Sequence, residues 1–258
     1  MANLTQLKML EDLDGFLFVD KPVGIAFSTV VKTVKRKFNL VKVGHGGSLD
    51  ALASGLFILL INDANKFVGD VMGADRAYTG TMRLGLRTNT HDVQGVPVEN
   101  NRIVELSNNR IENEGDGGQI GELASADKIE SALNDFRGDV FQTEPRFCSI
   151  RKEGSAAYEV ADTGDHAQFL THVYRFAVAG TDAPDRLSFE VSGTKSLLVR
   201  TLVNDFGERL GCGAALESLR RVRIGKFSVE GAVPFDKLLQ TEMRDFASCV
   251  LPLSVALR

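Results

Sequence analysis

The glycine-rich stretch "VGHGGSLDALASG", residues 43–55, constrains the fold of this chain more than any other feature. Gly44, Gly46 and Gly47 precede a single carboxylate, Asp50. Glycine lacks a Cβ, so it adopts positive φ angles and lets another backbone or a ligand come close, but it weakens helices and strands. The stretch therefore predicts a flexible loop placed directly before one acidic side chain.

This loop has three interpretations on its residues alone. The first is a tight turn whose glycines supply positive φ angles. The second is a phosphate-binding loop, which has weak support because neither G-x-x-x-x-G-K-[ST] nor G-x-G-x-x-G occurs in the chain. The third is a loop that a nucleic-acid backbone approaches while Asp50 points into a pocket. Further elements are needed to separate them.

Composition narrows the class of protein. The 258 residues, 43% of them hydrophobic, can bury one sizeable core or two modest ones. There is no signal-peptide pattern and no apolar run of the roughly 18 residues that span a membrane, so we expect a cytoplasmic protein without a membrane partner. The cysteines are few, far apart and free of C-x-x-C pairs, which predicts small buried side chains without a disulfide framework or a zinc site: Cys148, Cys212 and Cys249.

The charge of the chain is unevenly distributed. The net charge is −4, yet residues 92–140 hold 11 acidic and 4 basic residues, so the remainder carries an excess of bases. Within that region, residues 99–124 are rich in Asn, Glu and Gly, and we interpret them as an exposed acidic insertion. A mildly basic body can present a basic groove, so the balance permits an RNA partner without indicating one.

Strands and helices alternate irregularly along the chain. Short apolar and alternating runs predict strands at residues 15–20, 76–86, 139–143, 172–180, 186–193 and 220–229. Apolar residues at helical spacing predict helices at residues 28–39, 63–74, 125–138 and 196–210. Ser125 is the expected N-cap of the third helix, and "GCG" at residues 211–213 is expected to end the fourth. This mixture favours an α+β fold.

Six sequence blocks resemble, in order and spacing, the bacterial TruB-type tRNA pseudouridine synthases. They are "DKPVG" (20–24), "VGHGGSLDALASGL" (43–56), "RAYTGTMRLGLRTNTHDVQG" (76–95), "FRGDVFQTEP" (136–145), "GSAAYEVADTG" (154–164) and "VRTLVNDFGERLGCGAALESLRRVRIGKF" (199–227). The resemblance implies the pseudouridine synthase fold, a central mixed or antiparallel sheet flanked by helices. It also implies a single catalytic domain over residues 1–258, in which the acidic insertion contacts RNA.

The resemblance implies a reaction without a cofactor or a metal. A uridine in the T-loop of tRNA is isomerised in place to pseudouridine by a monomeric enzyme that binds the T-arm. Breaking the bond between uracil N1 and ribose C1′ develops positive charge on the sugar, which a carboxylate can capture or stabilise. Because a stacked base cannot reach that carboxylate, the uridine must be flipped out of the helix.

Three residues match the catalytic positions of the family. Asp50 is the expected catalytic carboxylate. Tyr78 matches the tyrosine that packs against the flipped uracil, a stacking contact worth roughly 1 to 3 kcal/mol. Arg200 matches the arginine that pairs with the aspartate, and its charge would keep Asp50 ionised in a pocket of low dielectric constant.

Four further residues match positions that bind the RNA or shape the pocket. His45 would hold open the space that the flipped uridine leaves, while the glycines around it would let the RNA backbone approach. Leu198 and Leu219 correspond to apolar contacts near the uracil. Lys21, with Pro22 beside it, matches the turn that supports the catalytic loop.

The chain departs from the family at several positions. Ala51 replaces a proline after the aspartate, Leu198 replaces a tyrosine, and "EPRFCSIR" has Phe147, Cys148 and Arg151 where Tyr, Ser and Lys are usual. These changes affect the expected rate and substrate preference more than the type of reaction. They also support an alternative function on the same fold, a tRNA-binding or RNA-folding protein with a weakened or lost activity. A nucleotide-binding enzyme is a third hypothesis, which has little support because the chain lacks the P-loop lysine.

The C-terminal region is short for this family. Many members append an RNA-binding PUA domain of roughly 60 to 80 residues after the closing strand, whereas 31 residues follow Phe227 here. We therefore expect no PUA domain, and contact with tRNA should rest on the catalytic domain.

Overall fold

The computed structural model describes residues 13–98, 126–143 and 168–256. These residues form two compact units. The first unit comprises residues 1–77 and 220–258, and the second comprises residues 78–219. The predicted insertion, the Ser125 cap and the "EPRFCSIR" segment after Thr143 lie outside the described residues.

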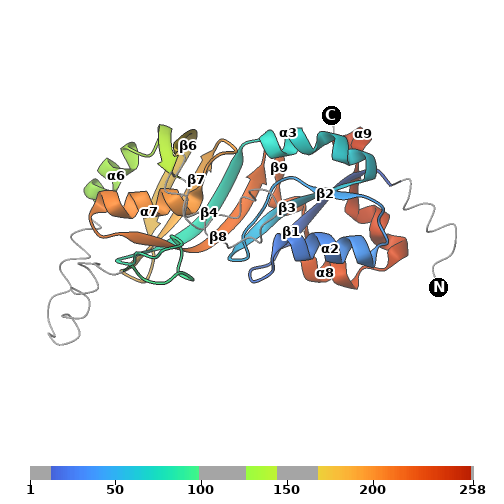
Figure 1. Cartoon of the computed structure of the whole chain (residues 1–258), viewed down its shortest axis with the longest axis horizontal. Helices are drawn as coiled ribbons and strands as arrows, with labels where there is room; N and C mark the ends of the chain where they lie inside the picture. Colours follow the sequence, from blue (N-terminus) through green and yellow to red (C-terminus); the bar gives the residue numbers. More distant parts are fainter. Residues whose placement is uncertain (1–12, 99–125, 144–167, 257–258) are drawn as a thin grey trace. The chain divides into compact units, whose positions relative to one another are not determined.

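The first unit contains a mixed β-sheet. β1 pairs antiparallel with β3 and β11 and parallel with β10, while β2 pairs antiparallel with β3. The end of β8 turns back through β9. The bounds are β1 Gly15–Lys21, β2 Val43–His45, β3 Ala53–Ile61, β8 Ala214–Ile224, β9 Phe227–Ser228, β10 Val233–Pro234 and β11 Val250–Pro252. The predicted strand at residues 15–20 is confirmed as β1 (Figure 1).

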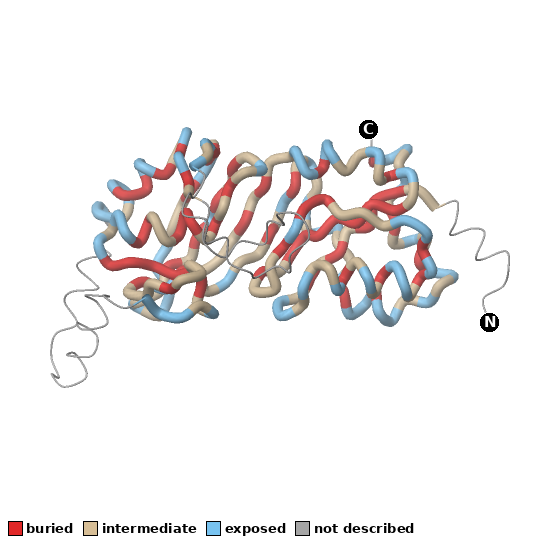
Figure 2. The backbone as a smooth tube through the Cα atoms, in the orientation of Figure 1, coloured by how far each residue is buried: buried red, intermediate tan, exposed pale blue. Residues whose placement is uncertain are grey.

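β3 forms the centre of this unit's core, and it was not predicted from the sequence. Its residues from Leu56 to Ile61 are fully buried, with Phe16 and Val19 of β1 among their buried neighbours. A strand that is buried on both faces has no alternation of apolar and polar residues, so period-two reasoning fails on "ASGLFILLI". In Figure 2, where buried residues are red, almost all of the residues of this strand belong to the buried class.

Helices cover the sheet of the first unit. The predicted helix at residues 28–39 is confirmed as α2, Phe27–Lys37, which buries Val30 and Val34. α8, Phe235–Gln240, packs beside it (Figure 1). The remaining short elements of the C-terminal part are η2 (Val229–Gly231), η3 (Met243–Cys249) and α9 (Leu253–Ala256), none of which was predicted.

The predicted helix at residues 63–74 is only partly correct. The segment forms a 3₁₀ helix, η1 (Asn62–Phe67), followed by one short α-helix, α3 (Val68–Gly73). The Asn65 side chain donates to the Leu60 and Asn62 carbonyl oxygens at 3.0 and 2.9 Å. These side-chain bonds offer the backbone an alternative to regular α-helical pairing.

The second unit contains a sheet in which β5, β6 and β7 run antiparallel, with the strand order β8, β4, β7, β6, β5. The bounds are β4 Arg76–Leu84, β5 Gly138–Thr143, β6 Gln168–Gly180 and β7 Arg186–Gly193. The predicted strands at 76–86, 139–143, 172–180 and 186–193 are confirmed with small shifts at the ends. The predicted strand at 220–229 is wrong in its bounds, because β8 begins at Ala214 and the chain turns at Gly225, where φ is 52°.

α6 (Ala126–Asn134) and α7 (Val199–Leu210) pack together in the second unit (Figure 1). Phe206 of α7 contacts Phe136 and Phe176 edge to face, at ring distances of 5.9 and 5.4 Å. α7 ends as predicted at a glycine in the left-handed conformation, Gly211 with φ 82°. Both units therefore combine a sheet with packed helices, and the α+β prediction is confirmed.

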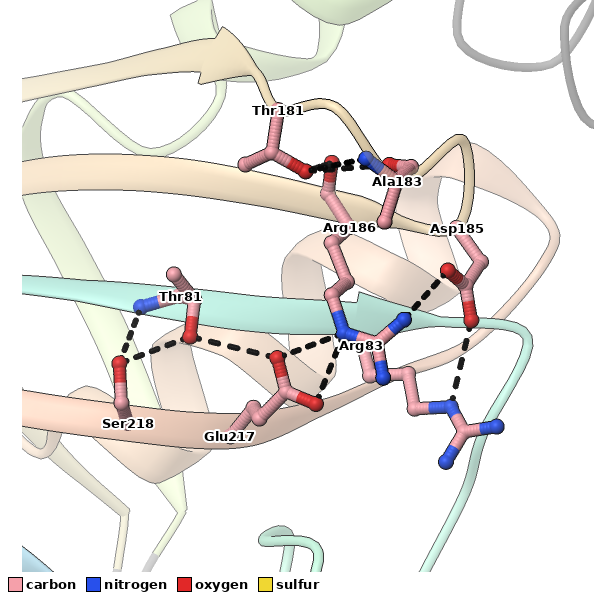
Figure 3. Close-up of polar contacts among 8 residues, drawn as sticks. All are labelled: Thr81, Arg83, Thr181, Ala183, Asp185, Arg186, Glu217 and Ser218. Carbon is pink, nitrogen blue, oxygen red and sulfur yellow. Dashed lines mark hydrogen bonds and ion pairs between the residues drawn. The ribbon is translucent and has the colours of Figure 1, made fainter.

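A network of polar contacts fixes β4, β7 and β8 in register (Figure 3). The Thr81 hydroxyl and the Ser218 hydroxyl are 2.7 Å apart, and the Ser218 oxygen also accepts from the Thr81 backbone N–H at 3.1 Å. Nε of Arg186 donates to both carboxylate oxygens of Glu217 at 2.9 Å. Arg83 and Arg186 also contact Asp185, at 3.4 and 2.7 Å. Partly exposed ion pairs add little stability, so the main consequence is alignment.

No helix among the described residues is long and apolar enough to cross a lipid bilayer. Of the three cysteines, Cys212 is buried as predicted, Cys249 is partly buried, and Cys148 lies outside the described residues.

Candidate functional site

The glycines before Asp50 are required by packing inside the first unit. A Cβ on Gly44 would lie 2.1 Å from Oδ1 of Asn65, and a Cβ on Gly46 would lie 2.3 Å from Cγ1 of Val71. Both distances are far below van der Waals contact. The family resemblance implied that these glycines let the RNA backbone approach, whereas η1 and α3 already occupy the space beside Gly44 and Gly46.

His45 is held in an aromatic environment on the same loop. Its ring lies 5.2 Å from the Phe27 ring and 5.9 Å from the Phe57 ring. The backbone N–H of Gly47 donates to Nδ1 of His45 at 3.3 Å, which leaves Nε2 as the hydrogen-bond donor of the neutral ring. Gly47 has a φ of +118°, and a Cβ there would lie 2.9 Å from Arg76 Nη2. The loop therefore fixes the orientation of His45.

The "KPVG" turn is bonded to the loop that carries the acid. Nζ of Lys21 donates to the carbonyl oxygens of Pro22 and Ile25 at 2.8 and 2.9 Å. The backbone N–H of Gly24 donates to the carbonyl oxygen of Ala51 at 2.7 Å. Lys21 is fully buried, so its place is within the turn, and this geometry supports the predicted supporting role.

Lys21 also responds to the charge of Asp50. Burial lowers the pKa of Lys21 to about 8, and the Asp50 carboxylate opposes this decrease, whereas the Arg221 guanidinium adds to it. Lys21 is therefore cationic at neutral pH, close to the candidate catalytic acid. Since its folded pKa lies below that of the unfolded chain, the burial penalty is fully present below pH 8 and is relieved as the pH rises further.

We predict that Asp50→Asn lowers the pKa of Lys21 below about 8, because the substitution removes the charge that raises it. The measurement is an NMR titration of the lysine Cε signals in wild type and variant. Asp70→Asn, which removes an exposed carboxylate from the same unit, is the matched control. An unchanged Lys21 titration in Asp50→Asn would contradict the predicted proximity.

Arg221 is a second buried cation behind the loop, and sequence reasoning missed it. Its side chain is 1% exposed. Nε donates to the Leu56 carbonyl oxygen and Nη1 to the Ser48 carbonyl oxygen, both at 2.8 Å. It therefore ties the segment just before Asp50 to β3. The run "RRVRI" contains three arginines, of which only Arg221 is buried. Nothing in the sequence distinguishes the buried arginine from the other two.

Arg200 is anchored by the loop at residues 88–95 in the second unit. Its side chain is mostly buried, and Nη1 donates to the Thr90 carbonyl oxygen at 3.2 Å. Nη1 also lies 3.5 Å from Oδ2 of Asp92. The other carboxylate oxygen of Asp92 accepts from the Thr90 hydroxyl and the Gln94 backbone N–H, at 2.8 and 3.0 Å. Asp92 was not predicted as a partner, although it lies within a block that carried the resemblance.

The same loop is fastened to β8 on either side of Asp92. The backbone N–H of Leu216 donates to the His91 carbonyl oxygen, and that of Val93 donates to the Leu216 carbonyl oxygen, both at 2.9 Å. His91 has a φ of 62°. Burial, and then the charge of Arg200, lower the pKa of His91, so this histidine is neutral at neutral pH. Arg200 is thus held by a preorganised loop.

The remaining predicted residues are positioned by regular elements of the second unit. Tyr78 is 8% exposed and lies in β4, three residues before Thr81 of the polar network. Leu219 follows Ser218 in β8 and is half-buried. Leu198 precedes α7, and its backbone N–H and carbonyl are both bonded to the Gln142 side chain, at 2.9 and 3.0 Å.

The structure therefore groups the predicted residues by unit. The first unit holds Lys21, His45 and Asp50, and the second holds Tyr78, Leu198, Arg200 and Leu219. That the two groups form one pocket stays a prediction. Within the described residues, no cluster of three or more His, Cys, Asp or Glu side chains could hold a metal ion.

Two protein-family models match this chain. Residues 35–124 match the model of the TruB family pseudouridylate synthase N-terminal domain, and residues 200–258 match that of the tRNA pseudouridylate synthase B C-terminal domain. The tRNA pseudouridine synthase B of Aquifex aeolicus is 34% identical over 250 residues, 95% of this chain and 80% of its relative. The chain belongs to the TruB family.

A second curated relative and a solved structure are also similar over most of the chain, the latter in its fold. The tRNA pseudouridine synthase B of Burkholderia pseudomallei (strain 668) is 35% identical over 229 residues, 88% of this chain and 69% of the relative. The Cbf5 complex with Nop10 and Gar1 has a TM-score of 0.65 at 24% identity, covering 97% of this chain and 63% of the solved one. The chain thus spans somewhat under two thirds of that structure.

These comparisons confirm the family predicted from the six blocks and the pseudouridine synthase fold. The C-terminal family model reaches residue 258, beyond the last block at residue 227. The expected lack of a PUA domain, the single-domain organisation and the roles of the site residues stay predictions.

Proposed function

We propose that this TruB protein isomerises a uridine in the T-loop of tRNA to pseudouridine. The observation that carries the proposal is the similarity to tRNA pseudouridine synthase B along 95% of the chain. Asp50, Tyr78 and Arg200 stand inside the sequence blocks that resemble this family. The proposed enzyme acts as a monomer on the T-arm in the cytoplasm, where its substrate is found, and uses neither a metal nor a cofactor.

Asp50 has the central role in the proposed reaction. As the bond from N1 to C1′ breaks, its carboxylate captures or stabilises the positive charge on the ribose. The uracil then turns and bonds to C1′ through C5. The hydrogen at C5 leaves as a proton, and N1, which has lost its bond to C1′, gains a proton, so the product is an isomer of the substrate. The bonds from Gly24 and Arg221 to the residues flanking Asp50 hold the loop in place for this step.

The other residues would bind and present the uridine. His45 fills the space from which the base is flipped, and its fixed ring suits that role. Tyr78 stacks on the uracil, with Leu198 and Leu219 as apolar contacts. Arg200, already held by the Asp92 loop, would pair with Asp50 and keep it ionised.

The test is the release of tritium from tRNA labelled at uracil C5, combined with mapping of the modified position. The proposal expects stoichiometric release from one T-loop uridine. Tight tRNA binding without release would instead support the alternative, an RNA-binding or RNA-folding protein, which Leu198 at the family's tyrosine position favours. Release from another site would contradict the T-loop assignment.

We predict that Arg221→Met lowers kcat by about a hundredfold and leaves KM nearly unchanged, because the loop before Asp50 loses its tie to β3 while the RNA contacts remain. The buried Leu56 carbonyl group also loses its donor, so stability falls by roughly 1 to 3 kcal/mol. The measurement is steady-state kinetics at a temperature where both proteins are folded. Arg223→Met, which changes an exposed neighbour, is the control. Equal kinetics in the two variants would disprove the positioning role.

A further inference from the structure

One segment of the first unit carries an unusual concentration of positive charge. Between Asp20 and Asp50 the chain has no acidic residue, although its net charge is −4. Lys21, one of the six basic residues in this segment, is buried in the turn described above. The other five belong to α2 or to the loop that follows it: Lys32, Lys35, Arg36, Lys37 and Lys42.

The spacing of the helical cations places three of them on one face. Lys32, Lys35 and Arg36 are related by three and four residues, so they are neighbours on the helix surface. All three are exposed, whereas Val30 and Val34 on the opposite face are fully or almost fully buried. Figure 2 shows this alternation of exposed and buried turns along α2. Together with the exposed Lys42, these three residues form what we call the α2 basic surface.

The α2 basic surface has no acidic partners among the residues that the structure describes. Several cations elsewhere do have acidic partners: Arg137 pairs with Glu130, and Arg209 pairs with Asp135. Cations in the last turn of a helix interact favourably with the helix dipole, and this accounts structurally for the positions of Lys35 and Arg36. The helix dipole does not account for Lys32, near the middle of α2, or for Lys42, which lies beyond the end of the helix.

α2 is packed directly against the loop that leads to Asp50. Phe27, the first residue of α2, contacts the His45 ring at 5.2 Å and the Phe57 ring at 6.1 Å. At the other end, the Lys42 carbonyl oxygen accepts from the Asn62 backbone N–H at 3.0 Å, immediately before β2. The α2 basic surface is therefore rigidly attached to the candidate catalytic loop.

We propose that the α2 basic surface binds the phosphate backbone of the substrate RNA, away from the nucleotide that reacts. This inference rests on the proposed function. Cations without acidic partners can replace the counterions of phosphate groups, which is the main source of RNA affinity. An anionic membrane is a poorer partner, because α2 has already buried its apolar face and has none to insert.

The test removes three charges without touching the catalytic loop. In the triple variant Lys32→Gln, Lys35→Gln, Arg36→Gln, the dependence of log K for tRNA on log salt should become shallower by about 2 to 3, and Kd at 0.1 M salt should rise roughly tenfold or more. KM should rise with Kd, while kcat at saturating tRNA stays as in wild type. The matched control loses three exposed cations of the same unit that have other contacts: Lys66→Gln, Arg244→Gln and Lys226→Gln.

The outcomes separate this surface from the proposed function. Active wild type with an equal salt dependence in the two triple variants would overturn the α2 basic surface and leave the function intact. Loss of binding to phosphatidylglycerol vesicles with unchanged tRNA binding would also overturn it. A wild type that binds tRNA through the α2 basic surface but releases no tritium would support the surface and overturn the catalytic proposal.

Discussion

Asp50→Asn should abolish tritium release from C5-labelled tRNA, lowering kcat by at least roughly a thousandfold. The amide keeps the size of the carboxylate but cannot offer negative charge to the ribose carbon from which uracil departs. Nothing in the loop replaces it, because residues 21–49 contain no other acid. Binding of tRNA should stay within a few-fold of wild type, since phosphate contacts supply most of the affinity.

The control for this experiment is Asp70→Asn, which removes the same charge from an exposed position of the same unit. It should leave kcat and KM unchanged. Circular dichroism and thermal unfolding would show that both variants are folded. If Asp50→Asn releases tritium at a rate within tenfold of wild type, Asp50 is not the catalytic carboxylate.

Local sequence patterns predicted most elements of the fold that have a polar face, and the short apolar run of β1 was recognised as well. α2 was recognised because lysines stand opposite Val31, Val34 and Phe38, although the structure buries Val30 and leaves Val31 half-buried. β7 was recognised because apolar residues alternate along it. β3 was missed because it is buried on both faces and therefore has no alternation. The short C-terminal elements were missed because six or seven residues are too few to display a period.

The residues of the candidate site were predicted from the family resemblance and not from local patterns. The family resemblance pointed to Asp50, Tyr78 and Arg200 because these residues stand inside long blocks. The residues that hold them were missed: Arg221 behind the loop and Asp92 beside Arg200. Their roles depend on contacts between segments far apart in sequence, and a single sequence does not display such contacts. The glycines before Asp50 show the same limit, since their neighbours lie in η1 and α3.

Gly55→Ala should destabilise the first unit more than Gly24→Ala or Gly69→Ala does. Gly55 has a φ of +102°, which alanine adopts only with strain of about 1 to 2 kcal/mol. Its Cβ would lie 2.3 Å from the carbonyl oxygen and 2.8 Å from the nitrogen of Arg221. These are backbone atoms, so they yield only if β3 and β8 separate. We expect a total loss of roughly 3 kcal/mol or more.

Substitutions at two other glycines of the same unit separate the backbone strain from the steric clash. Gly24 has a φ of +86° but open space around its Cβ position, so Gly24→Ala should show the backbone strain alone. Gly69 lies in α3 with no neighbour within 4 Å, and Gly69→Ala should be neutral or stabilising by about 0.5 to 1 kcal/mol. Urea unfolding of the three variants measures the series. If Gly55→Ala is no less stable than Gly24→Ala, then β3 and β8 do not approach as closely at Arg221 as the structure has them. The loop before Asp50 would then lose its proposed support, because the same arginine bonds to Ser48.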